Sequence, residues 1–195
     1  MEQNRAPTRK RGFAKTFESL GVRSYRYLWL GSFLQMLSMQ MQMMARGYLI
    51  YELTHSATTL GIVMAAAAIP ALITGVFAGV LADRLEKKRI IQGTQFVSSL
   101  LAFSIGTLIL SGNITWQYLL AASVVQGTLM PMLMPARQSI VPQLVGRERL
   151  MNAIALNSML MSSSNLLGPT LAGGLIATIG IGRAYYLMAG LNIGA

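Results

Sequence analysis

The sequence predicts an all-α membrane protein, an up-and-down bundle of five full transmembrane helices and a truncated sixth, with a cytoplasmic N-terminus. Three observations predict this class. Of the 195 residues, 53% are hydrophobic and only 11% are charged, whereas about 25% are charged in soluble domains. The hydrophobic residues form long continuous runs. The lysines and arginines gather at the ends of these runs.

The length of each apolar run predicts the individual helices. A helix needs about 20 apolar residues to cross roughly 30 Å of hydrocarbon. Because the runs are continuous rather than alternating, they exclude a spanning β-barrel and favour helices. The connectors are short, including the one at Pro135–Arg149, so consecutive helices are expected to run antiparallel. The five full runs are Leu28–Tyr51, Leu60–Leu81, Ile90–Leu110, Trp116–Met134 and Leu150–Ile179, and a sixth begins at Ala184.

The distribution of Lys and Arg sets the orientation, because short cytoplasmic loops are enriched in both. Seven of the sixteen lie in residues 1–26, four in 84–89 and three in 137–149. On the opposite side the connectors carry only Arg183, and Arg46 lies within the first run. This asymmetry predicts a multi-pass membrane protein with a cytoplasmic N-terminus. The net charge of +10 is therefore a topology signal and does not indicate nucleic-acid binding.

The side chains that most enzymes need are scarce. The chain has no cysteine and a single histidine, His55, which excludes disulfides, thiolate ligands and histidine-based metal sites. No cluster of acid, base and nucleophile occurs in the runs, so we expect no enzymatic activity, no metal and no cofactor. The runs also contain no Asp or Glu to carry a proton. A coupling carboxylate would be Asp83 or Glu52 at the edges, or lie outside this chain.

The strongest local motif follows the second run and reads Gly-Val-Leu-Ala-Asp-Arg-Leu-Glu-Lys-Lys-Arg over residues 79–89. A basic stop-transfer flank explains its cations but neither Gly79 nor Asp83. Gly75 and Gly79 lie four apart, a small-residue surface that allows close helix approach. Asp83 could accept hydrogen bonds from the N-terminus of a neighbouring helix. The predicted site comprises Gly75, Gly79, Asp83, Arg84, Lys87, Lys88 and Arg89.

This motif resembles the signature of the major facilitator superfamily between its second and third helices, Gly-x-Leu-Ala-Asp-Arg-x-Gly-Arg-Arg-Arg/Lys. The one departure is Glu86, which stands where the family has its second glycine. Glycine supplies a positive φ at little cost and glutamate does not. The resemblance implies a conformational latch that holds the outward-open state. Its basic residues would fix Asp83, and its partner helix would belong to a second, homologous half that this chain lacks.

A second motif lies in the fifth run. Its proline removes a helix hydrogen bond and bends the axis, and its glycines open a groove on one side. Generic packing between membrane helices is the alternative explanation, since Gly and Pro are common there. The motif resembles the Gly-Pro-x-x-Gly-Gly signature that the superfamily's exporters carry in their fifth helix. The residues are Gly168, Pro169, Ala172, Gly173 and Gly174, with Ala172 in place of the first paired glycine.

Polar stripes on the first and fourth runs predict a substrate cavity. Polar groups in a span normally face the bundle interior, and the resemblance implies that these two helices line the central cavity. For Arg46, snorkelling to the outer interface is an equally good explanation. The fourteen methionines suit varied ligands, although simple core filling also explains them. The candidate cavity residues are Gln35, Met39, Gln42, Arg46, Gln126, Met130 and Arg137.

Residues 25–195 as a whole resemble the enterobactin-exporter-like and macrolide-efflux-like branch of the superfamily. The resemblance implies proton-coupled efflux (an antiporter) of small amphiphilic molecules by alternating access, in contact with the lipid bilayer. The run from Ala184 to Ala195 reaches only about 18 Å, so we expect a fragment. Residues 1–26 would be a basic cytoplasmic tail and 27–195 an incomplete N-terminal six-helix bundle. The alternative is a complete small membrane-embedded binding or assembly protein that dimerises through Gly75 and Gly79.

Overall fold

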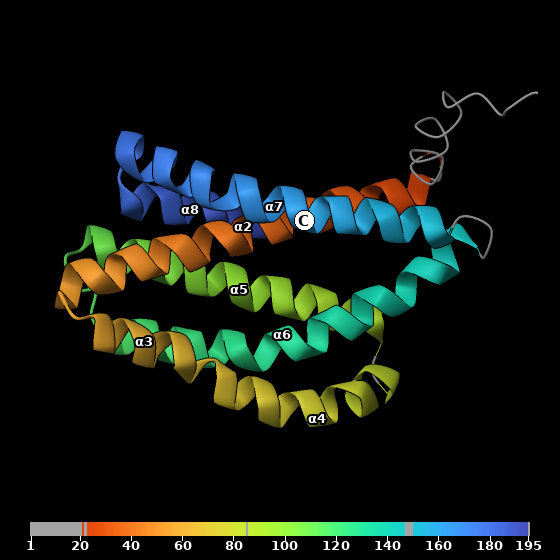
Figure 1. Ribbon diagram of the computed structural model, residues 1–195, viewed down its shortest axis with the longest axis horizontal. Helices are drawn as coiled ribbons and strands as arrows, with labels where there is room; N and C mark the ends of the chain where they lie inside the picture. The colour runs from red at the N-terminus through yellow and green to blue at the C-terminus, as the bar shows by residue number, and fades with distance from the viewer. Residues whose placement is uncertain (1–20, 22, 85, 147–149, 195) are drawn as a thin grey trace, which may run out of the picture.

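The computed structural model describes residues 21, 23–84, 86–146 and 150–194. For residues 24, 79–84 and 143 it describes the backbone and not the side chains. Within these ranges every regular element is a helix, so the all-α class is confirmed. The helices run back and forth along one long axis (Figure 1). They are α2 (Arg23–Thr54), α3 (Ala57–Ala66), α4 (Ala68–Arg84), α5 (Lys87–Leu110), α6 (Trp116–Val145), α7 (Leu150–Ile179) and α8 (Ile181–Ile193).

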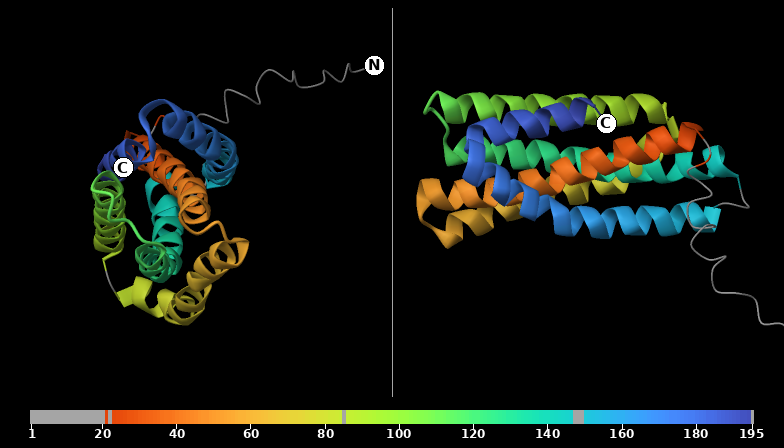
Figure 2. Two further views of the ribbon diagram at one scale, coloured as in Figure 1. Left: turned by 90° about the vertical axis from the view of Figure 1, so that its left-hand side faces the viewer. Right: turned by 90° about the horizontal axis from the view of Figure 1, so that it is seen from above.

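Three closely packed helix pairs organise the bundle. They are α5 with α8, α2 with α7, and α4 with α6. The end-on view of Figure 2 shows α4 and α7 on opposite sides of the bundle, with α2 and α6 between them. The main buried cluster joins α2, α5, α6 and α8 around fully buried side chains. Its largest members are Met41, Ile50, Ile105, Leu119, Tyr185 and Met188.

The second predicted span is broken in the structure, with α3 and α4 meeting at Ala67. The cause is Pro70, which lacks the N–H that would bond the carbonyl of Ala66 and whose ring crowds that carbonyl. The chain keeps its direction, because Ala67 itself is helical, with φ −73° and ψ −24°. At this break the backbone of Ala67 packs closely against Gly127 of α6, so that a Cβ added at Gly127 would collide with it.

The predicted connector at Pro135–Arg149 is wrong over most of its length, because α6 continues to Val145 with Pro131, Pro135 and Pro142 inside it. Membrane helices tolerate proline where neighbouring groups satisfy the freed carbonyls. The helix ends only at Gly146, whose φ of 71° suits glycine. The other runs agree better with the structure: α7 has the predicted bounds, whereas α2 begins at Arg23 rather than Leu28 and α8 at Ile181 rather than Ala184.

Three helical stretches in the described part of the chain are long and apolar enough to cross a membrane: Ala57–Ala78, Lys87–Leu110 and Trp116–Pro142. At 32 and 30 residues, α2 and α7 are long enough, but their Gln, Ser and Asn side chains lower their apolarity. The count of five full spans and the cytoplasmic N-terminus stay predictions. Residues 1–20 and 22 of the basic tail lie outside the described residues.

We expect Gly127→Ala to destabilise the purified, detergent-solubilised protein. The new methyl group would meet the Ala67 backbone, which cannot rotate away as a side chain can. Overpacking of this kind costs about 1–3 kcal/mol, measurable as a fall of several degrees in the thermal unfolding midpoint. Gly174→Ala is the matched control, because no atom lies within 4 Å of a Cβ there. Equal midpoints for the two variants would contradict the close approach of α6 to Ala67.

Candidate functional site

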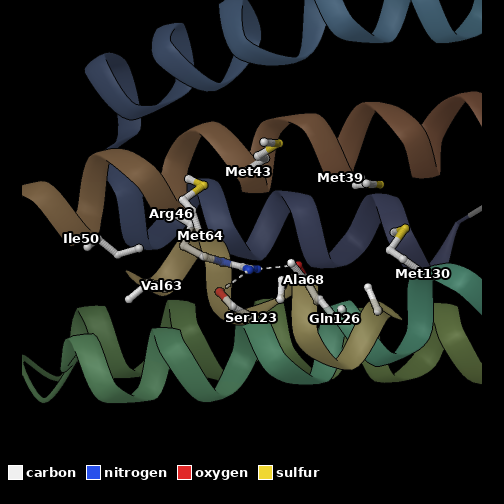
Figure 3. A pocket seen from close by; sticks show the side chains of 13 residues that line it. Met39, Met43, Arg46, Ile50, Val63, Met64, Ala68, Ser123, Gln126 and Met130 are labelled. Atoms are coloured by element: carbon white, nitrogen blue, oxygen red, sulfur yellow. Dashed lines mark hydrogen bonds between the residues drawn. The ribbon is translucent and has the colours of Figure 1, made fainter. Parts of the chain in front are cut away.

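A cavity of about 360 Å³ lies between α2, α3, α4 and α6, beside the junction of α3 and α4 (Figure 3). Its volume is within the range of small-ligand pockets. Methionine sulfur atoms surround it on three of the helices, and its polar side chains come from α2 and α6. The lining residues are Met39, Met43, Arg46, Ile50, Val63, Met64, Ala67, Ala68, Ala71, Ser123, Gln126, Gly127 and Met130.

Arg46 is the charged side chain of this cavity, and it is only 7% exposed. Its Nη1 donates to Ser123 Oγ at 3.0 Å and its Nη2 to Gln126 Oε1 at 2.6 Å (Figure 3). Both acceptors are neutral. The Nε of Arg46 is buried and has no hydrogen-bond partner within the described ranges. The structure therefore places Arg46 in the bundle interior, and of the two explanations for it, snorkelling to the outer interface is wrong.

A chain of hydrogen bonds holds the Gln126 amide in one orientation. Its Nε2 donates to Gln42 Oε1 at 3.1 Å, and Gln42 Nε2 donates to Ser38 Oγ at 3.0 Å. The Ser38 hydroxyl in turn donates to the backbone carbonyl of Met188 in α8 at 2.9 Å. Because the amide nitrogen of Gln126 faces Gln42, its oxygen faces Arg46. The chain thus ties α8, α2 and α6 together around the cavity.

The seven predicted cavity residues divide into three groups. Met39, Arg46, Gln126 and Met130 line the cavity, and Gln42 supports it from behind. Gln35 and Arg137 lie outside it. There, Arg137 Nη2 donates to Gln35 Oε1, which also accepts from Gln95 Nε2 of α5 at 3.5 Å. The Nε of Arg137 is buried without a partner among the described atoms.

Sequence reasoning missed two hydroxyl groups of the site, Ser38 and Ser123. Both lie one helical turn before a glutamine that it identified, Gln42 and Gln126. Ser38 falls within the span of the first stripe, and Ser123 would be reached by extending the second stripe by one turn. Serine alone is a weak signal in a membrane helix, because its hydroxyl can bond the preceding turn of its own backbone. Ser123 does so, donating to Leu119 O at 2.9 Å, and accepts from Arg46 as well.

The fifth-helix motif packs α7 against α2. A Cβ at Gly168 would collide with the Gln40 side chain, and Ala172 is fully buried. Gly173 comes within 3.8 Å of the Met44 side chain when a Cβ is added, whereas Gly174 has open space around it. Pro169 is exposed. These contacts agree with the packing explanation of the motif.

The latch motif lies only partly among the residues that the structure describes. The surroundings of Gly79 and the side chains of Asp83 and Arg84 are outside it. A Cβ added at Gly75 would lie 3.9 Å from Pro131 Cβ of α6. The basic residues Lys87, Lys88 and Arg89 form the first turn of α5, where Arg89 Nε lies 2.7 Å from Glu86 Oε2. The φ of Glu86 is −61°, so the turn does not require a glycine there.

Comparison with known proteins identifies related chains. Residues 14–192 match a family model described as transmembrane secretion effector. The chain is 28% identical over 140 residues to an uncharacterized MFS-type transporter, YfiS, of Bacillus subtilis, covering 72% of this chain and 32% of that protein. It is 27% identical over 153 residues to the staphyloferrin A transporter of Staphylococcus aureus, covering 78% and 38%.

The enterobactin exporter EntS of Citrobacter koseri is 28% identical over 169 residues, which cover 85% of this chain and 40% of the exporter. The chain therefore spans between 32% and 40% of the length of these curated relatives. The helices described above therefore correspond only to this matched part of each relative.

We expect Gln126→Leu to destabilise the protein, because it leaves Arg46 Nη2 and Gln42 Oε1 without their partner. Loss of a buried hydrogen bond to a charged group costs about 1.5–3 kcal/mol. The free energy of unfolding in detergent measures this, with Gln138→Leu as control, since Gln138 is exposed on the same helix. The double variant Arg46→Met/Gln126→Leu should recover part of the loss, because it removes the stranded charge. Strictly additive losses would refute the coupling.

Proposed function

The chain belongs to the transmembrane secretion effector family of the major facilitator superfamily, and we propose that it is the N-terminal half of a transporter. The complete transporter would export small amphiphilic molecules of drug or siderophore type by secondary-active alternating access. In such carriers two helical halves rock about a substrate site near the bilayer midplane. The observation that carries the proposal is the cavity beside Arg46, which lies inside the bundle between α2, α3, α4 and α6.

The composition of the cavity supports an amphiphilic substrate. Methionine side chains are flexible and polarizable, so they adapt to ligands of different shapes. Met39, Met43, Met64 and Met130 supply such a surface, and Arg46 with Gln126 supplies the polar end. Two relatives are named for siderophores, staphyloferrin A and enterobactin, which makes this class the first to test. We do not propose enzymatic activity, since the relatives are transporters.

The proposal places the chain in the inner membrane of a bacterium, with the lipid bilayer, a small-molecule substrate and a second half as its partners. Within the apolar runs the sequence carries no Asp or Glu. A proton-coupled antiporter would therefore use Asp83 or Glu52 at the edges of the runs, or a carboxylate of the second half. The alternative is a complete small membrane protein that dimerises through Gly75 and Gly79.

Export is tested by expressing the complete reading frame that contains these residues in a bacterial host that lacks its own major exporters. We expect at least one amphiphilic toxin or siderophore to be exported, which raises the inhibitory concentration of the toxin or the extracellular siderophore several-fold over the empty vector. Energised inside-out vesicles should accumulate the same compound, and a protonophore should abolish accumulation. A full panel with no change in growth, secretion or vesicle uptake would overturn the proposal.

We further propose that Asp83 acts as the latch of the outward-open state, accepting hydrogen bonds from a helix N-terminus of the second half. Asp83→Asn removes the charge that this helix terminus favours, an effect of about 0.3–1 kcal/mol or more when partly buried. We expect export by this variant to fall several-fold while substrate binding persists. The control is Glu86→Gln, which removes an exposed carboxylate three residues on. Wild-type export by Asp83→Asn would contradict the latch.

A further inference from the structure

We propose that the cavity beside Arg46 is selective for acidic amphiphiles, with the anionic group of the ligand against Arg46 and its apolar body against the methionines. The inference rests on the proposed transport function and assigns that site a substrate charge. It follows from the charge, the hydrogen bonding and the lining of the cavity.

The first step is the charge balance of the cavity. A guanidinium group stays protonated in proteins, and burying a charge without a counter-charge is costly. Arg46 is buried and donates to the neutral oxygens of Ser123 and Gln126, and the neutral Tyr185 hydroxyl of α8 lies beside it. The sequence contains six acidic residues, at positions 2, 18, 52, 83, 86 and 148. The structure describes the side chains of two of these, Glu52 and Glu86. Neither lines the cavity, and Glu52, six residues after Arg46, is exposed.

The second step is the unused hydrogen-bonding capacity of Arg46. Its Nε is buried without a partner within the ranges that the structure describes, so the guanidinium is incompletely satisfied. A carboxylate, sulfonate or phenolate oxygen in the cavity would offer a charged acceptor. Charge-assisted hydrogen bonds are roughly twice as strong as neutral ones, and guanidinium groups bind carboxylates through paired donors. Among ligand charges, an anion is therefore the one that completes this site.

The third step concerns the means of binding an organic cation. Proteins hold such ligands with a carboxylate or with aromatic faces. Among the residues that the structure describes, those that line the cavity include neither an acidic nor an aromatic side chain. Instead they present one buried positive charge, that of Arg46. Four methionines, Ile50 and Val63 form the apolar surface. A cationic amphiphile would meet repulsion from Arg46, and a small inorganic anion would leave the apolar surface uncovered.

The experiment compares three fluorescent ligands that share one aromatic body: 1-pyrenebutyrate, 1-pyrenebutanol and 1-pyrenebutylamine. The product of the complete reading frame is purified into nanodiscs, and binding to empty nanodiscs is subtracted. We expect the wild-type protein to bind the carboxylate at least about tenfold more tightly than the alcohol, and the amine most weakly. Arg46→Gln should remove this order while the alcohol still binds, which shows that the cavity is intact.

Arg183→Gln is the matched control, because it makes the same change at an exposed arginine and should leave the order of the three ligands unchanged. Arg46→Lys keeps the charge and should keep part of the preference for the carboxylate. If Arg46→Gln does not fold, the wild-type order and the Arg46→Lys variant decide. Equal affinities, a preference for the amine, or a preference that survives Arg46→Gln would overturn the inference.

Failure of this inference is distinguishable from failure of the proposed function. Preference for the amine together with active export would mean that a carboxylate of the second half neutralises Arg46; the transport function would then stand and the substrate charge would be wrong. Preference for the carboxylate without any export would support the anion site and overturn the transporter. Absence of binding by all three ligands would overturn the inference, whatever the export assays show.

Discussion

Helices in a bilayer gain little by hiding apolar side chains from one another, because the surrounding lipid is equally apolar. The association of this bundle therefore depends on close backbone approach and on hydrogen bonds between helices. Gly127 lets α6 meet the backbone at Ala67, and Gly168 lets α7 meet α2 at Gln40. The amides and hydroxyls between α2, α6 and α8 provide the hydrogen bonds. The polar side chains therefore stabilise the packing of the helices, whatever they also do in binding a ligand.

The same constraint makes Arg46 the most informative residue of the chain. A buried cation in lipid must be solvated by the protein, and Ser123 with Gln126 does so only with neutral oxygens. The supporting chain through Gln42 and Ser38 keeps the Gln126 oxygen turned toward the charge. Arrangement and function are linked at this point, because the groups that hold α2 to α6 also form the polar end of the cavity.

The agreement between sequence and structure differs from helix to helix for physical reasons. The bounds of α7 follow from its apolar run, and so do the C-terminal end of α5 and the start of α6. The extension of α6 through Pro135 and Pro142 was missed, because proline normally marks the end of a helix in water. In the bundle, neighbouring contacts support the chain beyond it. Pro70 indicates the break at Ala67, but the apolar run by which the second helix was predicted continues through both residues.

The sequence by itself determined the helical class, the apolar runs, the family signature and the polar stripe that contains Gln42 and Arg46. These properties depend on local composition and on a helical period of 3.6 residues, which need no knowledge of neighbours. Only the tertiary structure decided that Arg46 lies in the interior, that Gln35 and Arg137 belong to a separate cluster, and that Gly168 is a packing residue. These outcomes depend on how each helix is rotated toward its neighbours, and that rotation is set by contacts between residues far apart in the chain.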